Sequence, residues 1–399
     1  MSNPTNSMLR IGIMGFGGAG IAHLMNFRCA AGCAVTKVYD PKPGGLERAH
    51  RVDPNVGLCS SLDQFWPDLD AVVVCTPDDT HADYIVQALD RNLHVLCEKP
   101  LTDSIEGVLK VKRAAKRSKG VLAVVHQMRF VPLFGKIKTL IDSGKLGRIW
   151  YMEGYYVHDL RTRAWAHDNW RADGNATPMI YSGIHFLDLL RWFAGEELQE
   201  IYSAANNICF PGYPESDLNV AVLRFKSGLL AHLIVAFGAA GPQDHSVRIY
   251  GTDYSVDNNV LFGKDGSWAG TLHSPDLYQP EMVNRAGLSP TKEFMRQMRA
   301  NLPPVLLDRV FHATRFLSRR PGNEYGARQY PLRLYEHSLA CVRAISDFVR
   351  AVRTGAPPLC SVDESARAVL AGVAGVQSYR TNKPVEVLRL EDVVGDLLA

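Results

Sequence analysis

The chain has 399 residues, a length at which two or three domains of about 150 residues each are expected. Apolar residues make up 46% and charged residues 21%, an ordinary globular composition that excludes a disordered chain, a collagen-like fibre and a coiled coil. The 44 basic and 41 acidic residues leave a formal charge of +3. This excess is too small to suggest nucleic acid or a membrane surface as a partner.

The cysteines and the N-terminus favour a reducing compartment. None of the eight cysteines forms a CxxC pair, and Cys75 and Cys97 each follow strand-forming residues. Buried thiols in such positions behave as small hydrophobes, and a metal site or a disulfide is the alternative. The opening MSNPTNSMLR has no apolar signal segment, and no apolar run reaches the roughly 18 residues of a membrane span. We therefore expect a soluble cytoplasmic protein without a metal site or a membrane partner.

The first 125 residues alternate short apolar strands with helical patterns. The strands are apolar on both faces, as in the run AVVVC, which is typical of a parallel sheet covered by helices on both sides. This order predicts a doubly wound α/β nucleotide-binding domain over residues 1–126. Strands are expected at Ile11–Met14, Val35–Tyr39, Ala71–Cys75, His94–Cys97 and Val121–Val125, and helices at Ala19–Ala31, Ala82–Asp90 and Ser104–Ser118.

After Gln127 the expected strands become longer, more aromatic and alternating, which is typical of an antiparallel sheet. Two of them are joined by Lys226-Ser227-Gly228, a hairpin signal. Residues 127–399 are therefore predicted to form an α+β domain with a large, mostly antiparallel sheet. Its strands are expected at Ile149–Val157, Glu200–Ile208, Asn219–Phe225, Leu229–Phe237, Ser246–Tyr250, Asn258–Phe262 and Trp268–Leu272, and its helices at Pro132–Ser143, Met179–Phe193 and Leu339–Arg353.

One segment of the second domain differs from the rest in charge. Residues 285–333 hold ten basic residues against three acidic ones. We interpret about 275–335 as a basic helical insertion. It is either a solvated or subunit-facing element, or a rim that attracts a phosphorylated or nucleotide-linked substrate.

The residues GFGGAG, from Gly15 to Gly20, satisfy the GxGxxG pattern between a strand and a helix. Gly15 allows the tight turn, Gly17 lets the backbone approach a pyrophosphate, and Gly20 allows close packing of the helix on the strand. The free N–H groups and the positive end of the helix dipole suit phosphate groups. The pattern predicts a dinucleotide site, and the alternative is a glycine turn without a ligand.

Asp40 closes the second strand 20 residues beyond Gly20, where a carboxylate binds the ribose hydroxyls of the cofactor. Its charge would repel the 2′-phosphate of NADP, although Lys42 could partly offset that repulsion. We therefore predict NAD as the cofactor, with NADP as the alternative.

Glu98-Lys99-Pro100 follows the strand HVLC, at the carboxyl edge where ligands of such sheets bind. A lysine at this edge could contact both the nicotinamide ribose and a substrate hydroxyl. The alternative is that Glu98 forms only a surface ion pair with a neighbour.

With these motifs in order, the chain resembles the glucose-fructose oxidoreductase / inositol dehydrogenase family (Gfo/Idh/MocA). The resemblance covers residues 10–260 and 339–387 and leaves out the basic insertion. It implies a Rossmann domain and a second domain whose open sheet often forms subunit interfaces, hence a homodimer or homotetramer. It rests on GFGGAG, Cys75-Thr76-Pro77 followed by His81, Glu98-Lys99-Pro100, Arg129-Phe130, Trp170-Arg171 and the run from Gly183 to Trp192.

The resemblance implies an NAD(P)-dependent oxidoreductase that transfers hydride between nicotinamide and a hydroxyl or keto carbon of a sugar, cyclitol or nucleotide-sugar. The lysine of the family maps to Lys99 and its histidine to His185, and a histidine titrating near neutrality suits transfer of the hydroxyl proton. The expected cofactor contacts are Gly15, Phe16, Gly17, Gly18, Ala19, Gly20, Asp40, Thr76, Pro77, His81, Glu98, Lys99 and Gln127, and the expected substrate contacts are Lys99, Arg129, Trp170, Arg171, Tyr181 and His185.

The chain departs from the family pattern just before His185. Tyr181 stands where many relatives carry an aspartate, and Asn175-Ala176-Thr177 replaces a glycine cluster. Positions 181 and 185 share a face if they lie on one helix, so Tyr181 joins Lys99 and His185 as a catalytic candidate. Asp188 is expected on the other side of that helix and is interpreted as structural.

Two other functions fit the same residues, because a fold alone does not decide a function. A tightly held NAD could enable elimination or hydrolysis of a glycoside through a transient keto-sugar, and net consumption of NAD separates this reaction from a dehydrogenase. The third hypothesis is a non-catalytic protein that binds a dinucleotide or a sugar. Retention of both Lys99 and His185 argues against it, since binding alone needs neither.

Overall fold

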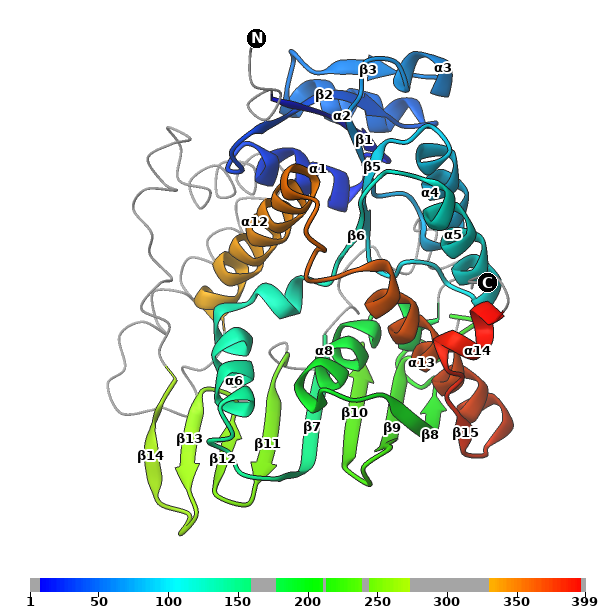
Figure 1. The fold of residues 1–399 in the computed structure, drawn as a ribbon. Coiled ribbons are helices and arrows are strands. Elements are labelled where there is room, and N and C mark those ends of the chain that lie inside the picture. Colours follow the sequence, from blue (N-terminus) through cyan, green and yellow to red (C-terminus); the bar gives the residue numbers. More distant parts are fainter. Residues whose placement is uncertain (1–7, 159–176, 211–212, 239–243, 273–329, 396–399) are drawn as a thin grey trace.

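Two sheets with helices between and around them make up the molecule, with the first sheet at the top of Figure 1 and the second at the bottom. The sequence predicted both sheets, and both are confirmed. None of the described helices is long and apolar enough to cross a membrane. All eight cysteines are free thiols. The computed structural model describes residues 8–158, 177–210, 213–238, 244–272 and 330–395.

The first sheet has six parallel strands in the order β3-β2-β1-β4-β5-β6. The order reverses between β1 and β4, which is the point where doubly wound sheets bind ligands. All four residues of β4 are buried, as expected from its apolar run. Of these strands, β3 was not predicted, because it has three residues, of which only Cys59 is buried, and this is too short for an apolar pattern. The strands are β1 (Leu9–Met14), β2 (Cys33–Tyr39), β3 (Gly57–Cys59), β4 (Ala71–Val74), β5 (His94–Glu98) and β6 (Leu122–Val125).

Helices cover both faces of this sheet. Side chains of α1, α2 and α12 share one apolar core with β1, and those of α4 and α5 lie in a second core on the opposite face. The start of α5 is fixed by Ser104, whose hydroxyl accepts a hydrogen bond from the backbone of Gly107, a standard N-cap. The helices are α1 (Gly18–Phe27), α2 (Pro43–Val52), α3 (Leu62–Phe65), α4 (His81–Leu89), α5 (Ile105–Arg117) and α12 (Tyr330–Thr354).

The second sheet has nine strands in the order β14-β13-β12-β11-β7-β10-β9-β8-β15. Among its described strand pairs only β7 and β10 are parallel, so the predicted, mostly antiparallel character is confirmed. The strands β12 and β15 were not predicted. The strands are β7 (Ile149–Val157), β8 (Leu198–Asn206), β9 (Leu218–Phe225), β10 (Leu230–Ala236), β11 (Val247–Gly251), β12 (Tyr254–Asp257), β13 (Val260–Gly263), β14 (Trp268–Thr271) and β15 (Val385–Glu386).

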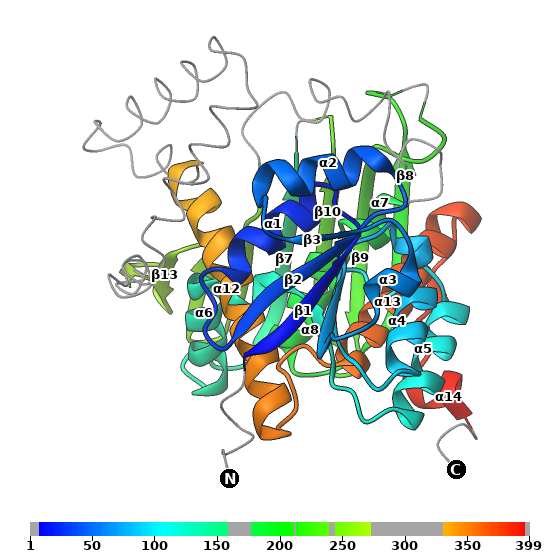
Figure 2. The ribbon, with the colours of Figure 1, turned by 90° about the horizontal axis from the view of Figure 1, so that it is seen from above.

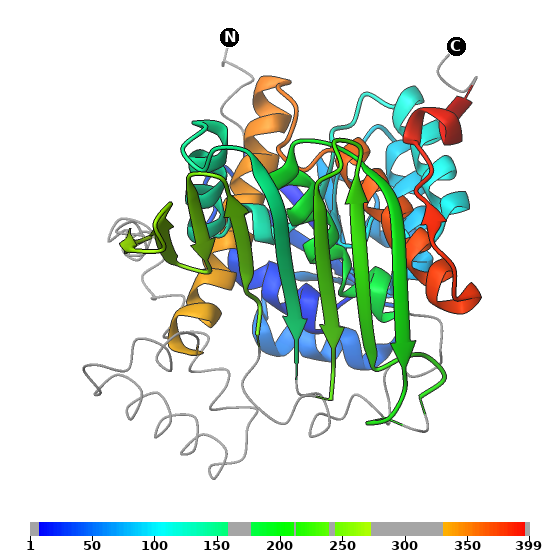
Figure 3. The ribbon, with the colours of Figure 1, turned by 90° about the horizontal axis from the view of Figure 1, so that it is seen from below.

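The described helices lie on one face of the nine-stranded sheet, and Figure 3 shows the sheet from the opposite face, which none of these helices covers. Residues of β9 alternate between buried and exposed, which leaves Val220 and Val222 exposed. The exposed large apolar side chains also include those of Trp150 and Tyr202. The helices associated with this sheet are α6 (Pro132–Asp142), α7 (Pro178–Tyr181), α8 (Ile184–Ala194), α13 (Val362–Thr381) and α14 (Leu390–Val394).

The late helix α12 returns to the first sheet, where Figure 2 shows it beside α1. Ile345 and Phe348 of α12 are fully buried in the core that also contains Ile11, Ile13 and Phe16. Residues from near the end of the chain therefore complete the core of the first domain. Residues 275–329 of the predicted basic segment lie outside the described residues. The last part of the segment, 330–335, forms the start of α12.

The helix predicted over Met179–Phe193 is interrupted, and this corrects the sequence analysis. The backbone N–H groups of Ser182 and Gly183 both donate to the carbonyl of Pro178, which ends α7, and α8 begins at Ile184. A Cβ at Gly183 would lie 2.5 Å from the carbonyl oxygen of Met179, so glycine allows this tight path. Tyr181 and His185 therefore lie on two different helices and do not share a helix face.

Candidate active site

The glycine turn between β1 and α1 has the geometry of a pyrophosphate cradle. Gly15 has a φ of 85°, and a Cβ there would lie 2.8 Å from the carbonyl oxygen of Cys75. A Cβ at Gly20 would lie 2.3 Å from the carbonyl oxygen of Gly15, so only glycine allows this packing. A Cβ at Gly17 or Gly18 would meet no described atom within 4 Å beyond the adjoining backbone. The turn thus offers open space against its backbone at the start of α1, which fits a dinucleotide phosphate.

Asp40 braces this turn from the end of β2. Its Oδ2 accepts a hydrogen bond from the backbone of Phe16 at 2.7 Å, and its Oδ1 accepts one from the backbone of Lys42 at 2.8 Å. An ionised carboxylate has about four lone-pair sites, so capacity remains for two hydroxyl donors. The carboxylate can therefore hold the turn and receive ribose hydroxyls together, which fits NAD.

His81 joins two loops at the carboxyl edge of the sheet. Its Nδ1 lies 2.8 Å from the carbonyl oxygen of Pro100, and its Nε2 lies 2.9 Å from that of Thr76. The side chain is buried, with both nitrogens directed at backbone carbonyls. The ring of His81 thus connects the loop of Thr76 to the loop of Pro100, and its contact with the cofactor stays a prediction.

Lys99 extends from the first domain to the segment that precedes α8. Its Nζ donates a hydrogen bond to the backbone carbonyl of Tyr181 at 2.8 Å. The peptide bond between Lys99 and Pro100 is cis. Lys99 and Tyr181 are 82 residues apart in the sequence. Their contact brings the predicted lysine to the chain segment that carries the predicted histidine.

His185 lies in the first turn of α8, buried against an aromatic cluster. Its ring stacks on Tyr156 with centroids 5.3 Å apart and planes 16° apart. Tyr156 also stacks on His245, with centroids 4.5 Å apart, and the Nε2 atoms of His245 and His158 lie 2.5 Å apart. Sequence reasoning missed this cluster. The available signal was that Tyr156 and His158 lie at the end of a predicted strand and just beyond it, as Glu98 and Lys99 do.

Tyr181 is almost fully buried, and its ring lies flat against another aromatic ring. The ring of Phe237 stacks on it with centroids 5.7 Å apart and planes 9° apart. The backbone carbonyl of Tyr181 accepts the hydrogen bond from Lys99. The ring of Tyr181 thus packs against Phe237, and its backbone carbonyl accepts from Lys99. A contact of its hydroxyl with substrate would be a third role.

Arg129 was expected to bind substrate, and the structure instead commits its guanidinium to carboxylates. Its Nε and Nη2 donate to the two oxygens of Asp188 at 2.8 and 2.7 Å. Its Nη2 also donates to Glu364 of α13 at 2.8 Å. Arg129 and Asp188 are both buried, so this is a structural ion pair. The interpretation of Asp188 as structural fits this geometry.

Burial and charge oppose each other at Asp188. Burial disfavours the ionised carboxyl, but the charges of Arg129 and His126 outweigh this effect and hold its pKa below the usual value. His126 lies 3.7 Å from the same carboxylate, and its own pKa is lowered chiefly by burial. The carboxylate therefore stays ionised within the protein.

The remaining expected site residues are placed as follows. Gln127 is buried in the 3-10 helix η3 (Gln127–Phe130), directly after β6. Trp170 and Arg171 lie outside the described residues. Within the described ranges, no group of three or more His, Cys, Asp or Glu side chains could hold a metal ion.

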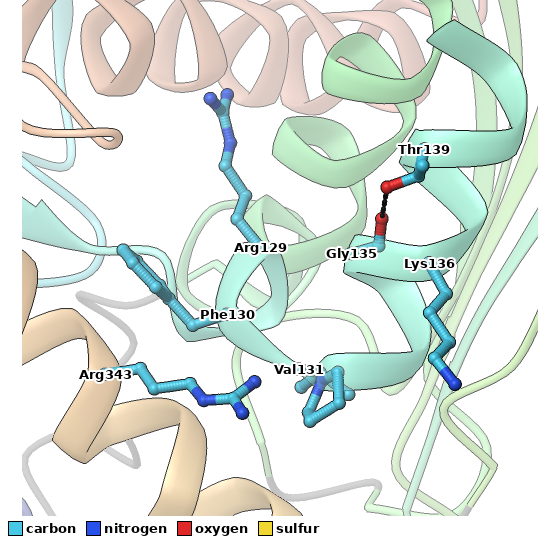
Figure 4. Close-up of a pocket in the computed structure, with 8 residues that line it drawn as sticks. Arg129, Phe130, Val131, Gly135, Lys136, Thr139 and Arg343 are labelled. Carbon is cyan, nitrogen blue, oxygen red and sulfur yellow. Dashed lines mark hydrogen bonds between the residues drawn. The ribbon is translucent and has the colours of Figure 1, made fainter. Parts of the chain in front are cut away.

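A cavity of about 400 Å³ opens beside the start of α6, and Figure 4 shows it. In this view the Arg129 side chain points away from Arg343. No part of the glycine turn, the Glu98-Lys99 loop or α8 lines it, so we do not assign it to the reaction. It is lined by Arg129, Phe130, Val131, Pro132, Gly135, Lys136, Thr139 and Arg343.

Two family models match the chain. Residues 9–126 match "Oxidoreductase family, NAD-binding Rossmann fold", and residues 134–257 match the "GFO/IDH/MocA C-terminal domain". The chain belongs to the Gfo/Idh/MocA oxidoreductase family. Its first domain is therefore an NAD-binding Rossmann domain, and the resemblance noted from the sequence is confirmed.

Individual members of the family are distant from this chain in sequence. It is 24% identical to a myo-inositol 2-dehydrogenase of Thermotoga maritima, over 97% of this chain and all of the relative. It is 27% identical to a scyllo-inositol 2-dehydrogenase (NAD(+)) of Bacillus subtilis, over 62% of this chain and 73% of the relative. A solved levoglucosan dehydrogenase in complex with NADH is similar in fold, with a TM-score of 0.74 and 19% identity over 96% of this chain and 100% of that one.

The Arg129–Asp188 pair gives a prediction for stability. Arg129→Met removes the guanidinium and leaves the Asp188 carboxylate buried without its main partner. We expect a loss of about 3–5 kcal/mol in the free energy of unfolding at neutral pH. The measurement is urea denaturation of the variant and the wild type.

The size of this loss should depend on pH. The wild-type pKa of Asp188 is lowered, so its stabilising contribution is present above its usual pKa of about 4 and is lost as the pH falls through the folded value. In Arg129→Met the pKa rises, and protonation relieves the buried charge. The difference between the two proteins should therefore shrink as the pH falls from the raised pKa of the variant to the lowered pKa of the wild type, and Asp188→Asn in the variant background should recover part of it at neutral pH. A difference that is constant with pH would contradict this account.

Proposed function

We propose that this protein is an NAD-dependent dehydrogenase that interconverts a secondary hydroxyl and a ketone on a sugar or cyclitol. The observation that carries the proposal is the contact from Lys99 to the carbonyl of Tyr181. It joins the edge of the cofactor domain to the segment from which His185 projects. An inositol or a similar polyol ring is the substrate class that the names of the relatives support.

The residues divide the reaction between them. The glycine turn and Asp40 hold the dinucleotide, which supplies nicotinamide C4 as the hydride acceptor when it is bound. The ammonium group of Lys99 has only donors, so it can polarise the substrate oxygen but cannot take its proton. A neutral imidazole has one acceptor nitrogen, and His185 is therefore the residue that takes the hydroxyl proton as the ketone forms.

A panel of polyols tests the proposal directly. Purified protein is incubated with NAD and with myo-inositol, scyllo-inositol or levoglucosan, and reduced nicotinamide is measured by absorbance. A dehydrogenase forms one NADH for each ketone produced. Cleavage of a glycoside without net NADH would favour the alternative in which the cofactor is recycled, and binding without any turnover would favour the non-catalytic alternative.

We further propose that the open face of the nine-stranded sheet is covered by a second copy of the chain, in a homodimer or homotetramer. The exposed apolar side chains of Trp150, Tyr202, Val220 and Val222 support this proposal, because monomers rarely leave such groups together in water. Sedimentation of a monomer at micromolar concentration would contradict it.

Cofactor preference follows from Asp40. Its carboxylate repels a 2′-phosphate, so we expect NADH to bind at least several-fold more tightly than NADPH. Titration of the protein with each nucleotide, followed by nicotinamide fluorescence, measures the two dissociation constants. Equal affinity, or tighter binding of NADPH, would show that the charge of Lys42 offsets that of Asp40.

Replacement of the proposed base separates binding from chemistry. His185→Ala should lower turnover by roughly 10² to 10⁴, the usual contribution of a positioned general acid or base, and leave NADH affinity nearly unchanged. Steady-state kinetics and fluorescence titration measure the two effects. Near wild-type turnover would make His185 a structural residue.

Tyr181→Phe is the matched variant for the neighbouring residue. It keeps the ring against Phe237 and the backbone carbonyl that accepts from Lys99, and removes only the hydroxyl. A loss of turnover with an unchanged melting temperature would assign the hydroxyl to the substrate. Full activity would limit Tyr181 to packing and leave proton transfer to His185.

A further inference from the structure

A hydrogen bond between a buried histidine and a partly buried glutamate links the cofactor helix α1 to the end of β5, the strand that precedes Lys99. His23 lies on α1, three residues after Gly20, and its Nε2 lies 2.6 Å from Oε1 of Glu98. The His23 side chain is only 2% exposed and that of Glu98 17%. The sequence analysis did not select His23, and it left open whether Glu98 contacts the cofactor or only forms a surface pair.

The charge of Glu98 fixes which atom donates in this pair. Burial alone would raise the pKa of Glu98, but the hydrogen bond from His23 and the charges of His23 and Lys99 lower it to about 2. Glu98 is therefore ionised, and an ionised carboxylate only accepts hydrogen bonds. His23 must carry a proton on Nε2 and donate it to Glu98.

The second oxygen of Glu98 faces the backbone of the lysine. Its Oε2 accepts a hydrogen bond from the backbone N–H of Lys99 at 3.3 Å. The side chain of Lys99 then reaches the carbonyl of Tyr181. A continuous set of contacts thus runs from α1 through His23 and Glu98 to Lys99.

We propose that His23 is a positioning residue that acts through Glu98 to hold Lys99 in place against the cofactor helix. The inference rests on the proposed function, because it assumes that Lys99 works on the substrate. The N-terminus of α1 faces the pyrophosphate cradle, so the pair ties the phosphate-binding helix to the reactive lysine. An apolar side chain at position 23 would leave the Glu98 carboxylate buried without its donor, and the Lys99 backbone would lose a fixed acceptor.

A double-mutant cycle tests the chain of contacts. His23→Leu should lower kcat by about tenfold with a much smaller change in KM, and Glu98→Gln should have a similar effect. In the Glu98→Gln background, His23→Leu should lower kcat by less than about twofold further, since the partner is already changed. His23→Gln keeps an N–H donor and should restore most of the activity.

His94→Leu is the matched control. His94 begins β5, the strand that Glu98 ends, and its Nδ1 accepts a hydrogen bond from the backbone of Val121 at 3.0 Å. Its replacement should lower the melting temperature and leave kcat within about twofold of the wild type. If His23→Leu and His94→Leu lose kcat equally, the effect of His23 is one of stability and the proposal is wrong. Independent effects of His23→Leu and Glu98→Gln would overturn it as well.

A second readout does not depend on turnover. Hydrogen exchange measured by mass spectrometry reports the protection of the Lys99 amide, which donates to Glu98. The peptide containing Lys99 should exchange faster in His23→Leu and in Glu98→Gln, and at the wild-type rate in His94→Leu. Unchanged exchange in His23→Leu would overturn the positioning role. The wild type could turn over none of the polyols while the peptide containing Lys99 still exchanges faster in His23→Leu and in Glu98→Gln. The proposed function would then fail, and the positioning of Lys99 by His23 and Glu98 would be supported.

Discussion

The arrangement of the two domains depends on one buried ion pair, that of Arg129 and Asp188. Arg129 lies in η3, directly after the last strand of the first sheet, and Asp188 lies on α8, one turn after His185. Either charge alone would be very costly in this apolar surrounding, so the two segments must stay together. Glu364 adds a third segment, α13, to the same guanidinium. The placement of the proposed base relative to the cofactor sheet is therefore set by electrostatics as well as by packing.

Much of this architecture could be predicted, because it is encoded locally. The AVVV run is apolar on both faces and the glycine pattern lies between a strand and a helix, so both could be recognised without tertiary information. The break before α8 could not, because Gly183 reads as an ordinary residue of an apolar helical run. The pairing of His23 with Glu98 joins residues 75 positions apart, and no local pattern relates them. Arg129 was assigned to the substrate for the same reason: its carboxylate partners are distant in the sequence.

Histidines hold together the carboxyl edge of the first sheet. His81 connects the loop after β4 to the loop after β5, and His23 connects the end of β5 to α1. An imidazole carries two nitrogens on one compact ring, so a single histidine side chain can lie between groups from two different segments at this crowded edge. The loops that frame the proposed nicotinamide site are therefore fixed by side chains that need not contact the ligand themselves.

The return of α12 to the first sheet has a consequence for synthesis on the ribosome. Roughly 220 residues separate Val125, at the end of that sheet, from Ile345, which completes its core. At about 5–20 residues per second, this interval corresponds to on the order of ten to forty seconds of translation. During that time the nascent sheet exposes the apolar surface of Ile11, Ile13 and Phe16 that α12 later covers. The cofactor domain thus leaves the ribosome well before the helix that completes its core.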